Sequence, residues 1–313
     1  MSLQKDKEKE KEVWKRQVRD FYDSIGWQMI DEGVYQNARF EDLRPVSREY
    51  IHRAHLRVKR YLKPTGRYLL DAGSGPVQYP EYLTYSEGYR YRVCADISIQ
   101  ALKEARRRLG DRGLYVVADV AHLPFASDVF DGVVSLHTIH HLPYEEHAQA
   151  YRELYRVLKP GATAVVVNGW RQPALLRWLR PIIWVADRIR WRLNRLRGHR
   201  PDADVAQAAL QQRRPDWQRA RTLVKKYTAD DLRAMLPDIP MEIYAWRALS
   251  VKAMRSLIHP RLGGRWLLRA LFWLEDRFPR FFGEKGAYPL IVLRKEAPST
   301  LQNADDKTPP STH

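Results

Sequence analysis

The chain has 313 residues, of which 44% are hydrophobic and one is cysteine, and its net charge is +17. This content is ample for a packed core, and the lone Cys94 excludes a framework of internal disulfides. No apolar run approaches the roughly 18 uninterrupted residues of a membrane-spanning helix, and the charged start of the chain lacks the apolar region of a secretory signal. We therefore expect a cytoplasmic protein that is at most peripheral at the inner face of the membrane.

The positive charge is concentrated in two segments. Residues 21–167 hold 19 Lys and Arg against 18 Asp and Glu, whereas residues 168–225 hold 14 against 4 and residues 251–280 hold 7 against 2. A polyanionic partner would therefore be met by the two later segments.

Changes in composition and turn-forming residues divide the chain into segments. The charged mixture at the start predicts a solvated helix or a disordered lead-in, and helical spacing over residues 48–62 ends before a Pro and Gly turn. In chain order we expect a lead-in (1–20), a core (21–167), a basic amphipathic helical insertion (168–226), a C-terminal part of the same sheet (227–296) that carries a second basic and aromatic insertion (251–283), and a disordered tail (297–313).

Residues 68–77 contain the pattern around which the core is organised. A short apolar run ends in Asp71, and a tight turn with Gly73 and Gly75 follows at once. Glycine lets the backbone take positive φ and pass close to a ligand, and the next helix would point its free N–H groups toward that ligand. The third glycine of a dinucleotide fingerprint is absent, and no Lys-Ser/Thr pair closes the turn as in a nucleoside-triphosphate loop.

After this turn, predicted strands and helices alternate strictly. Helices are expected from an N-cap at Ser98 through Leu109 and over residues 145–158. The further strands are expected at residues 91–96, 114–118, 130–136 and 162–168. This alternation predicts an α/β fold with a parallel, doubly wound sheet and right-handed crossovers.

Acidic residues stand at the ends of three predicted strands. Asp71, Asp96 and Asp119 each lie at or just past the carboxyl end of a strand, where ligands of such sheets bind. Asp96 follows Asp71 by 25 residues, the spacing at which an acid accepts hydrogen bonds from both ribose hydroxyls. No cations accompany these acids, so the pattern favours a nucleoside without phosphates.

Taken in order, the motifs resemble the core of a class I S-adenosylmethionine-dependent methyltransferase, of the small-molecule group often called type 11. The resemblance implies a Rossmann-like, mostly parallel sheet of seven strands whose last strand is antiparallel, with residues 287–295 as that strand and 241–249 as its hairpin partner. The motifs that carry it are Leu-Leu-Asp-Ala-Gly-Ser-Gly (69–75), Ala-Asp-Ile-Ser (95–98), Ala-Asp-Val-Ala-His-Leu-Pro-Phe (118–125), Phe-Asp-Gly-Val-Val-Ser (130–135), His-His-Leu-Pro (140–143) and Arg-Val-Leu-Lys-Pro-Gly (156–161).

The resemblance also implies a cofactor, S-adenosylmethionine, and assigns its contacts by position. Asp96 would hold the ribose and Ile97 would pack on adenine, while Asp119 would accept from the adenine amino group beside the Val120 backbone. The methionine end would be shaped by Asp71, Gly73 and Gly75 and lined by the stretch from Ser135 to His137. The chain departs from the family at Pro76-Val77, where many members have another glycine, and this leaves the geometry of the turn open.

Methyl transfer requires a base only when the acceptor must lose a proton. His137, His140 and His141 follow the fourth strand at the rim where the acceptor is expected, and histidine titrates near neutrality. One of them could be the base, or the cluster could pack and hydrogen-bond without chemistry. Tyr22 could likewise cover the cofactor or belong to the core. No metal site is predicted, because His52 and His55 lack an evident carboxylate or Cys companion.

The first insertion has the pattern of a long amphipathic helix, and residues 265–282 form a second aromatic and basic stretch that completes a cap over the acceptor site. Its predicted apolar stripe is Leu175, Leu179, Ile182, Ala186, Ile189, Leu193 and Leu196, with Arg177, Arg180, Arg188 and Arg195 opposite and Trp184 and Trp191 among them.

Arg with Trp suits an anionic membrane surface and equally suits RNA, and a solvated helix face is the third interpretation. We favour peripheral membrane contact through 171–200 and 261–283, because no RNA-binding module is recognisable. The sequence thus predicts a methyltransferase for a small, lipophilic acceptor. The alternatives are an RNA or tRNA methyltransferase and a non-catalytic cofactor-binding interaction protein.

Overall fold

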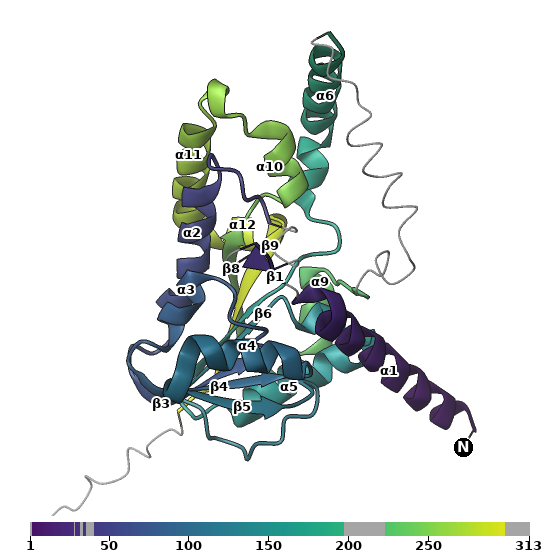
Figure 1. The fold of residues 1–313 in the computed structure, drawn as a ribbon, viewed down its shortest axis with the longest axis vertical. Helices are drawn as coiled ribbons and strands as arrows, with labels where there is room; N and C mark the ends of the chain where they lie inside the picture. The colour runs from purple at the N-terminus through teal and green to yellow at the C-terminus, as the bar shows by residue number, and fades with distance from the viewer. Residues whose placement is uncertain (1, 28, 32–33, 36–40, 197–222, 298–313) are drawn as a thin grey trace, which may run out of the picture.

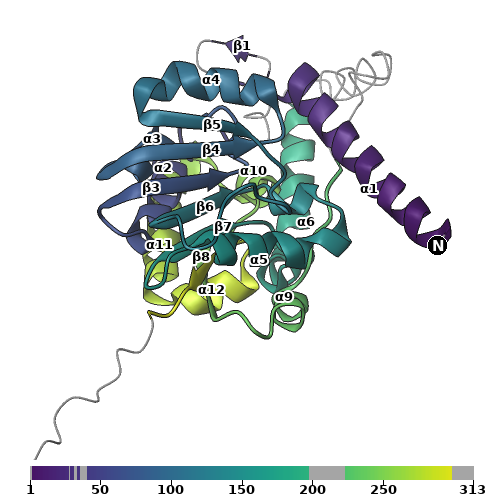
Figure 2. The ribbon, with the colours of Figure 1, turned by 90° about the horizontal axis from the view of Figure 1, so that it is seen from below.

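The computed structural model describes residues 2–27, 29–31, 34–35, 41–196 and 223–297, and a seven-stranded sheet forms its centre (Figure 2). From edge to edge the strands are β5 (Gly113–Val117), β4 (Tyr89–Asp96), β3 (Gly66–Ala72), β6 (Gly132–Leu136), β7 (Thr163–Val167), β9 (Tyr288–Arg294) and β8 (Met241–Arg247). The first five are parallel, which confirms the predicted α/β class.

The last two strands of the sheet also run as predicted. β9 is antiparallel to both β7 and β8 and lies between them. The pair β8–β9 is therefore a true antiparallel pair, but a long helical connection over residues 251–285 replaces the tight turn of a simple hairpin.

Helices cover both faces of the sheet because successive strand residues point to opposite sides. Leu70 of β3 belongs to the core beneath α5 (His147–Val157) and α9 (Ala229–Met235). Its neighbour Leu69 belongs to the core beneath α3 (Pro80–Leu83), α4 (Ile99–Leu109) and the 3-10 helix over Arg57–Tyr61 that follows α2 (Arg48–Leu56). The predicted N-cap is confirmed, since the Ser98 hydroxyl accepts a hydrogen bond from the Ala101 N–H at 3.1 Å.

The start of the chain forms a single helix, α1 (Ser2–Phe21), which extends beyond the sheet (Figure 1). A short antiparallel pair, β1 (Met29–Asp31) and β2 (Val34–Tyr35), follows it. Much of α1 is solvated as predicted, but its second half contacts the core through Trp14 and Val18.

A cap of helices stands at one end of the sheet (Figure 1). It consists of residues 41–47, α6 (Ala174–Leu196), α10 (Val251–Leu257), α11 (Gly264–Arg277) and α12 (Pro279–Lys285). The cap has its own apolar cluster, in which Met254 of α10 and Phe272 of α11 pack on Tyr50 of α2. Residues 197–222 of the predicted insertion and 298–313 of the predicted tail lie outside the described residues.

The predicted apolar stripe of α6 is partly wrong. Leu179 does pack on the cap cluster, but Ile182 is 57% exposed and Ile189 is 53% exposed. The residues that pack beside Leu179 are Leu176 and Ile183, because the first half of α6 packs against the other helices of the cap, whereas its far end extends past α10 (Figure 1). The side chains of Leu193 and Leu196 lie outside the described ones.

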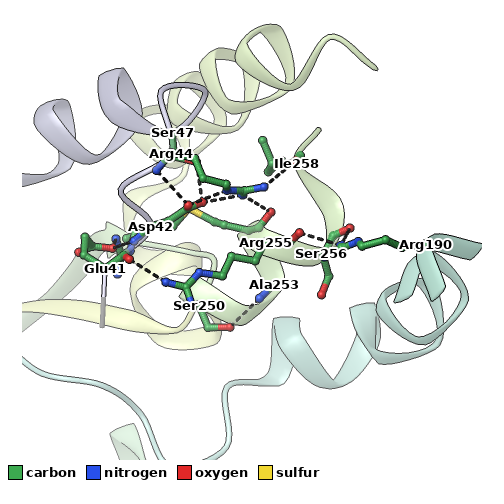
Figure 3. A network of polar contacts seen from close by, with 12 residues as sticks. Glu41, Asp42, Arg44, Ser47, Arg190, Ser250, Ala253, Arg255, Ser256 and Ile258 are labelled. Carbon is green, nitrogen blue, oxygen red and sulfur yellow. Dashed lines mark hydrogen bonds and ion pairs between the residues drawn. The ribbon is translucent and has the colours of Figure 1, made fainter. Parts of the chain in front are cut away.

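Arginines from two other elements hold the C-terminal end of α10 in place (Figure 3). Arg44 donates to the carbonyl oxygens of Met254 and Ile258 at 2.9 and 3.0 Å. Arg190 of α6 donates to the carbonyl oxygens of Arg255 and Ser256 at 2.7 and 2.8 Å. Helix ends leave such carbonyls without partners, and a cation there also complements the helix dipole.

Candidate active site

A cavity of about 1020 Å³ lies at the carboxyl ends of the parallel strands. Its floor comes from the loops after β3, β4, β5 and β6, and its walls come from α1 and from the cap. The predicted site residues that line it are Gly73, Gly75, Asp96, Ile97, Asp119, Val120, His137, His140 and His141. The structure therefore brings together residues that the sequence spreads over 69 positions.

The glycine turn needs its glycines for backbone conformation and for space. Gly73 has φ +74°, and a Cβ there would lie 2.1 Å from Cγ2 of Thr138. Gly75 has φ +53° and sits against the ring of Trp27. At the departure from the family pattern, the buried Val77 also has φ +53°, a conformation that β-branched residues rarely take. The turn thus keeps a left-handed backbone without a third glycine.

Asp96 joins the glycine turn to the start of α4. One carboxylate oxygen accepts from the Gly75 N–H and the other from the Ser98 N–H, both at 2.8 Å. A carboxylate offers about four acceptor positions, so two remain for a ligand. Burial raises the pKa of Asp96 to about 6, although these two N–H groups favour the charged form.

Asp119 lies at the other side of the cavity floor and is held by the N-terminal helix. Its Oδ1 accepts from the Ala121 N–H at 2.9 Å, and its Oδ2 lies 2.6 Å from Nζ of Lys15. Lys15 also contacts Glu146, and burial opposes but does not prevent a raised Lys15 pKa beside these two carboxylates. The second half of α1 therefore covers the cavity above β5.

The three histidines are neutral and differ in their contacts. His141 Nδ1 donates to the Leu223 carbonyl at 2.9 Å, so Nε2 of the neutral ring accepts from Tyr22 Oη at 2.8 Å. His140 Nδ1 pairs with Oδ1 of Asn168 at 3.0 Å. Burial lowers the pKa of His141 to about 4 and that of His140 well below its usual value.

His137 is the least constrained of the three rings. No side-chain hydrogen bond ties it to the residues that the structure describes, and its ring lies 4.9 Å from that of Trp246. Its backbone has φ +57°, an uncommon conformation of the kind found at functional sites. Burial, followed by the charge of Arg247, lowers its pKa to about 3.

Comparison with known proteins identifies the family of the core. Residues 70–166 match a family model described as a methyltransferase domain. The chain contains a class I S-adenosylmethionine-dependent methyltransferase domain. The cofactor is S-adenosylmethionine, and the acceptor positions left on Asp96 and the size of the cavity fit it.

Three curated relatives illustrate the range of this methyltransferase family. Methyltransferase GfsG of Streptomyces halstedii is 25% identical over 50% of this chain and 59% of its own. A tRNA (carboxymethyluridine(34)-5-O)-methyltransferase of Arabidopsis thaliana is 31% identical over 40% of this chain and 33% of its own. The ubiquinone/menaquinone biosynthesis C-methyltransferase UbiE of Paracoccus denitrificans is 34% identical over 36% of this chain and 47% of its own. The chain thus matches a third to about three fifths of each relative's length.

Two predicted cofactor residues of the methyltransferase domain lie behind the lining of the cavity. The Asp71 carboxylate accepts from Nε of the buried Arg92 at 3.1 Å, on the side of the sheet that α3 covers. The Ser135 hydroxyl donates to the Ala72 carbonyl at 2.8 Å. Both residues support the strands that carry the glycine turn, and neither faces the cavity.

Several residues that line the cavity are not predicted from the sequence. Lys15 is one, although Trp14, Val18 and Phe21 form an apolar stripe on an otherwise charged helix and could have indicated that α1 is docked. Arg247 of β8 is another, and nothing in its local sequence marks it.

His52 and His55 of α2 share one carboxylate companion. Glu81 contacts both His52 and His55 and is the carboxylate companion that the sequence did not reveal. Even so, no group of three or more His, Cys, Asp or Glu side chains in the described part of the chain is placed so that it could hold a metal ion. None of its described helices is both long and apolar enough to cross a membrane.

Proposed function

We propose that the protein transfers a methyl group from S-adenosylmethionine to a small, lipophilic acceptor that it takes up at a membrane surface. The observation that carries the proposal is one cavity of about 1020 Å³ whose lining includes both Asp96, beside the glycine turn, and His137, beneath the cap. Ligand pockets commonly measure about 300–1,000 Å³. The cavity therefore has room for a cofactor and an acceptor together.

The cofactor end would be formed by residues of the floor. Asp96 would accept from the two ribose hydroxyls through its free acceptor positions, and Ile97 would pack on adenine. Asp119 and the Val120 backbone would meet the adenine edge, while Gly73 and Gly75 would let the backbone approach the methionine end. The cofactor supplies an electrophilic methyl group on a sulfonium centre.

The chain's part in the reaction is alignment, exclusion of water and, where needed, proton removal. Orientation of two reactants can contribute about 7–11 kcal/mol to lowering a barrier. α1 shields the site, since Nε1 of Trp14 donates to the His141 carbonyl at 2.7 Å and Lys15 binds Asp119. A neutral imidazole can accept a proton, and His137 is our candidate base because its ring forms no hydrogen bond with another side chain among the described residues.

The cap supports a membrane-facing role through its exposed aromatic residues. Trp184 of α6 is 62% exposed and Trp266 of α11 is 72% exposed. Arg188 lies over the Trp184 ring at 5.6 Å, and Arg269 lies over the Trp266 ring at 5.2 Å. Aromatic rings settle at the membrane interface while arginine meets anionic headgroups. The far end of α6 and the start of α11 lie at the same end of the molecule (Figure 1).

The test uses methyl-labelled cofactor with separated lipid, RNA and metabolite fractions of a cell extract. Label in lipid or lipophilic metabolites supports the proposal, and the Asp96→Ala variant serves as the inactive control. If no fraction takes up label although S-adenosylhomocysteine binds, the protein is a cofactor-binding interaction protein and the proposal is wrong.

Methylation of RNA is the second candidate function. It is favoured by the 31% identity to a tRNA methyltransferase of Arabidopsis thaliana and by the basic segments after residue 167. RNA binding would weaken steeply with salt, since each phosphate neutralised adds about 0.7–0.9 to the slope of log K against log salt. Label in the RNA fraction together with such a slope would replace the lipophilic acceptor by RNA.

A further inference from the structure

An unusual concentration of positive charge lines the cap side of the cavity. Arg247 of β8 is 2% exposed, and its Nη1 lies 2.5 Å from Oε1 of Glu41. Its guanidinium also lies 4.7 Å from the centre of the Tyr288 ring, and its Nε has no hydrogen-bond partner among the residues described. A guanidinium has five N–H donors in a fork, so most of the donors of Arg247 are not used by Glu41.

Two lysines add to this charge without a matching carboxylate. Lys226 and Lys252 line the same cavity, and neither forms an ion pair within the described chain. The acids on the cofactor side are already engaged, because Asp96 binds two backbone N–H groups and Asp119 binds Lys15. Three cations therefore face one carboxylate, Glu41, and the cap side carries an excess of two positive charges.

The topology of the sheet places Arg247 far along the sheet from the strand that carries the glycine turn. β8 is the edge strand opposite β5, and four strand-to-strand steps separate it from β3, which carries the glycine turn. At about 4.8 Å per step, the axes of β8 and β3 lie roughly 19 Å apart. Arg247 therefore lies toward the opposite edge of the sheet from Asp96 and Asp119, which end or follow β4 and β5, although its charge also acts on Tyr79 beyond the glycine turn. His137 lies between the two ends, and the charges of Arg247 and Lys226 both act on it.

The remaining walls of the cavity are largely apolar and aromatic. Val18, Phe21 and Leu142 line it beside α1, and Tyr79 and Tyr82 line it beside α3. A ligand that satisfies both parts has an apolar body and an anionic group.

We propose that the acceptor is an amphiphile with a carboxylate or phosphate group, held by Arg247 with Lys226 and Lys252. The inference rests on the proposed function, because it assigns the acceptor of that same cavity. Arg247 provides the buried anchor, whose paired donors suit the oxygens of either anion. The lysines provide point charges, and the anion offsets the excess positive charge beside His137.

The test compares four twelve-carbon probes: dodecyl phosphate, dodecanoate, dodecanol and dodecyltrimethylammonium. Binding is followed by quenching of tryptophan fluorescence below the micellar concentration of each probe. We expect the two anionic probes to bind at least about tenfold more tightly than dodecanol, and the cationic probe to bind most weakly. Equal affinity for dodecyl phosphate and dodecanol would overturn the inference.

Variants assign the preference to the cavity. Lys226→Gln with Lys252→Gln removes two charges without leaving a buried carboxylate unpaired, and the preference for anions should fall to about threefold or less. Arg247→Gln with Glu41→Gln tests the anchor while removing both partners of the buried pair. The matched control is Arg188→Gln with Arg195→Gln, which removes two exposed charges from α6 outside the cavity. A loss in the control equal to that in the lysine variant would place anion binding on the cap surface and overturn the inference.

Calorimetry with S-adenosylhomocysteine separates this inference from the proposed function. The lysine variant should bind S-adenosylhomocysteine within about twofold of the wild type. If its affinity for S-adenosylhomocysteine falls while dodecyl phosphate still binds, the cations serve the cofactor carboxylate and the inference is wrong. If the wild type binds no S-adenosylhomocysteine but prefers dodecyl phosphate through these lysines, the anion site stands and the proposed function fails.

Discussion

Nζ of Lys15 lies 2.6 Å from Oδ2 of Asp119, so a residue near the start of the chain is tied to the carboxylate expected to meet the adenine edge of the cofactor. Both side chains are about one fifth exposed, and Lys15 also reaches Glu146 at 2.7 Å. The ion pair makes α1 a cover whose position depends on two carboxylates of the methyltransferase core.

Lys15→Met should therefore loosen the cover. Hydrogen bonds to charged groups contribute about 1.5–3 kcal/mol, so we expect S-adenosylhomocysteine to dissociate about tenfold faster, as measured by stopped-flow fluorescence. Lys11→Met is the matched control, since Lys11 contacts only Glu8 of the same helix in the described structure. An unchanged dissociation rate in Lys15→Met would show that α1 does not retain the cofactor.

Cofactor affinity should depend on the protonation of Asp96. Burial raises its pKa to about 6, so the carboxylate becomes protonated as the pH falls through that value and loses acceptor positions for the ribose. One pH unit below the pKa, roughly a tenth of the groups are charged. We expect S-adenosylhomocysteine affinity by calorimetry to fall about tenfold between pH 7.5 and pH 5. Asp96→Asn should bind weakly with no step near pH 6, and a step that persists in this variant would assign it to another group.

His137→Asn should slow methyl transfer and leave cofactor binding intact. Asparagine tolerates the positive φ of this position better than most residues, so the backbone should keep its course. For an acceptor that must lose a proton, loss of a general base lowers kcat by about 10²–10⁴-fold. The assay uses the fraction that takes up label, with the exposed His259→Asn, outside the cavity, as control. A kcat within twofold of wild type would show that His137 is not the general base.

Glu275 of α11 anchors the cap to the sheet. Its loss should lower the free energy of unfolding more than the loss of a surface carboxylate. Glu275 is fully buried, accepts from Tyr50 Oη at 2.5 Å and from the Ala248 N–H at 2.7 Å, and pairs with Arg57 at 2.7 Å. Removing one partner of such a pair costs about 3–5 kcal/mol. We expect Glu275→Ala to lower the free energy of unfolding in urea by that amount. The exposed Glu49→Ala, which loses only surface pairs, should leave the midpoint nearly unchanged, and equal losses would contradict an anchoring role.

Trp184→Ala combined with Trp266→Ala should weaken membrane association. Both rings are largely exposed on the cap, and interfacial binding scales with the apolar area that enters the headgroup region. We expect partitioning onto sedimented vesicles of mixed phosphatidylcholine and phosphatidylglycerol to fall about tenfold. Tyr144→Ala, an exposed aromatic outside the cap, is the control. If the wild-type protein does not bind such vesicles, uptake of the acceptor at a membrane surface is not part of its function.

The sequence alone determined the sheet and much of the cavity floor. Strand, turn and helix follow from local periodicity and from capping residues such as Ser98, which depend on neighbours within a few positions. Parallel strands end at one edge of a sheet, so Asp96 and Asp119 could be expected to share a site before any contact was known.

The tertiary structure alone decided which side chains face the ligand. Asp71 and Asp96 point to the same face of the sheet, since Asp71 is paired with Cys94, two residues before Asp96. Arg92 holds the Asp71 carboxylate behind the lining of the cavity, whereas Asp96, at the last position of β4, lines it. The fold of the cap brings Glu41 to Arg247, 206 positions away in the sequence. The docking of α1 brings Lys15 to Asp119, 104 positions away. A buried charge requires a partner. These partners are distant in the sequence, so no local sequence pattern could predict them.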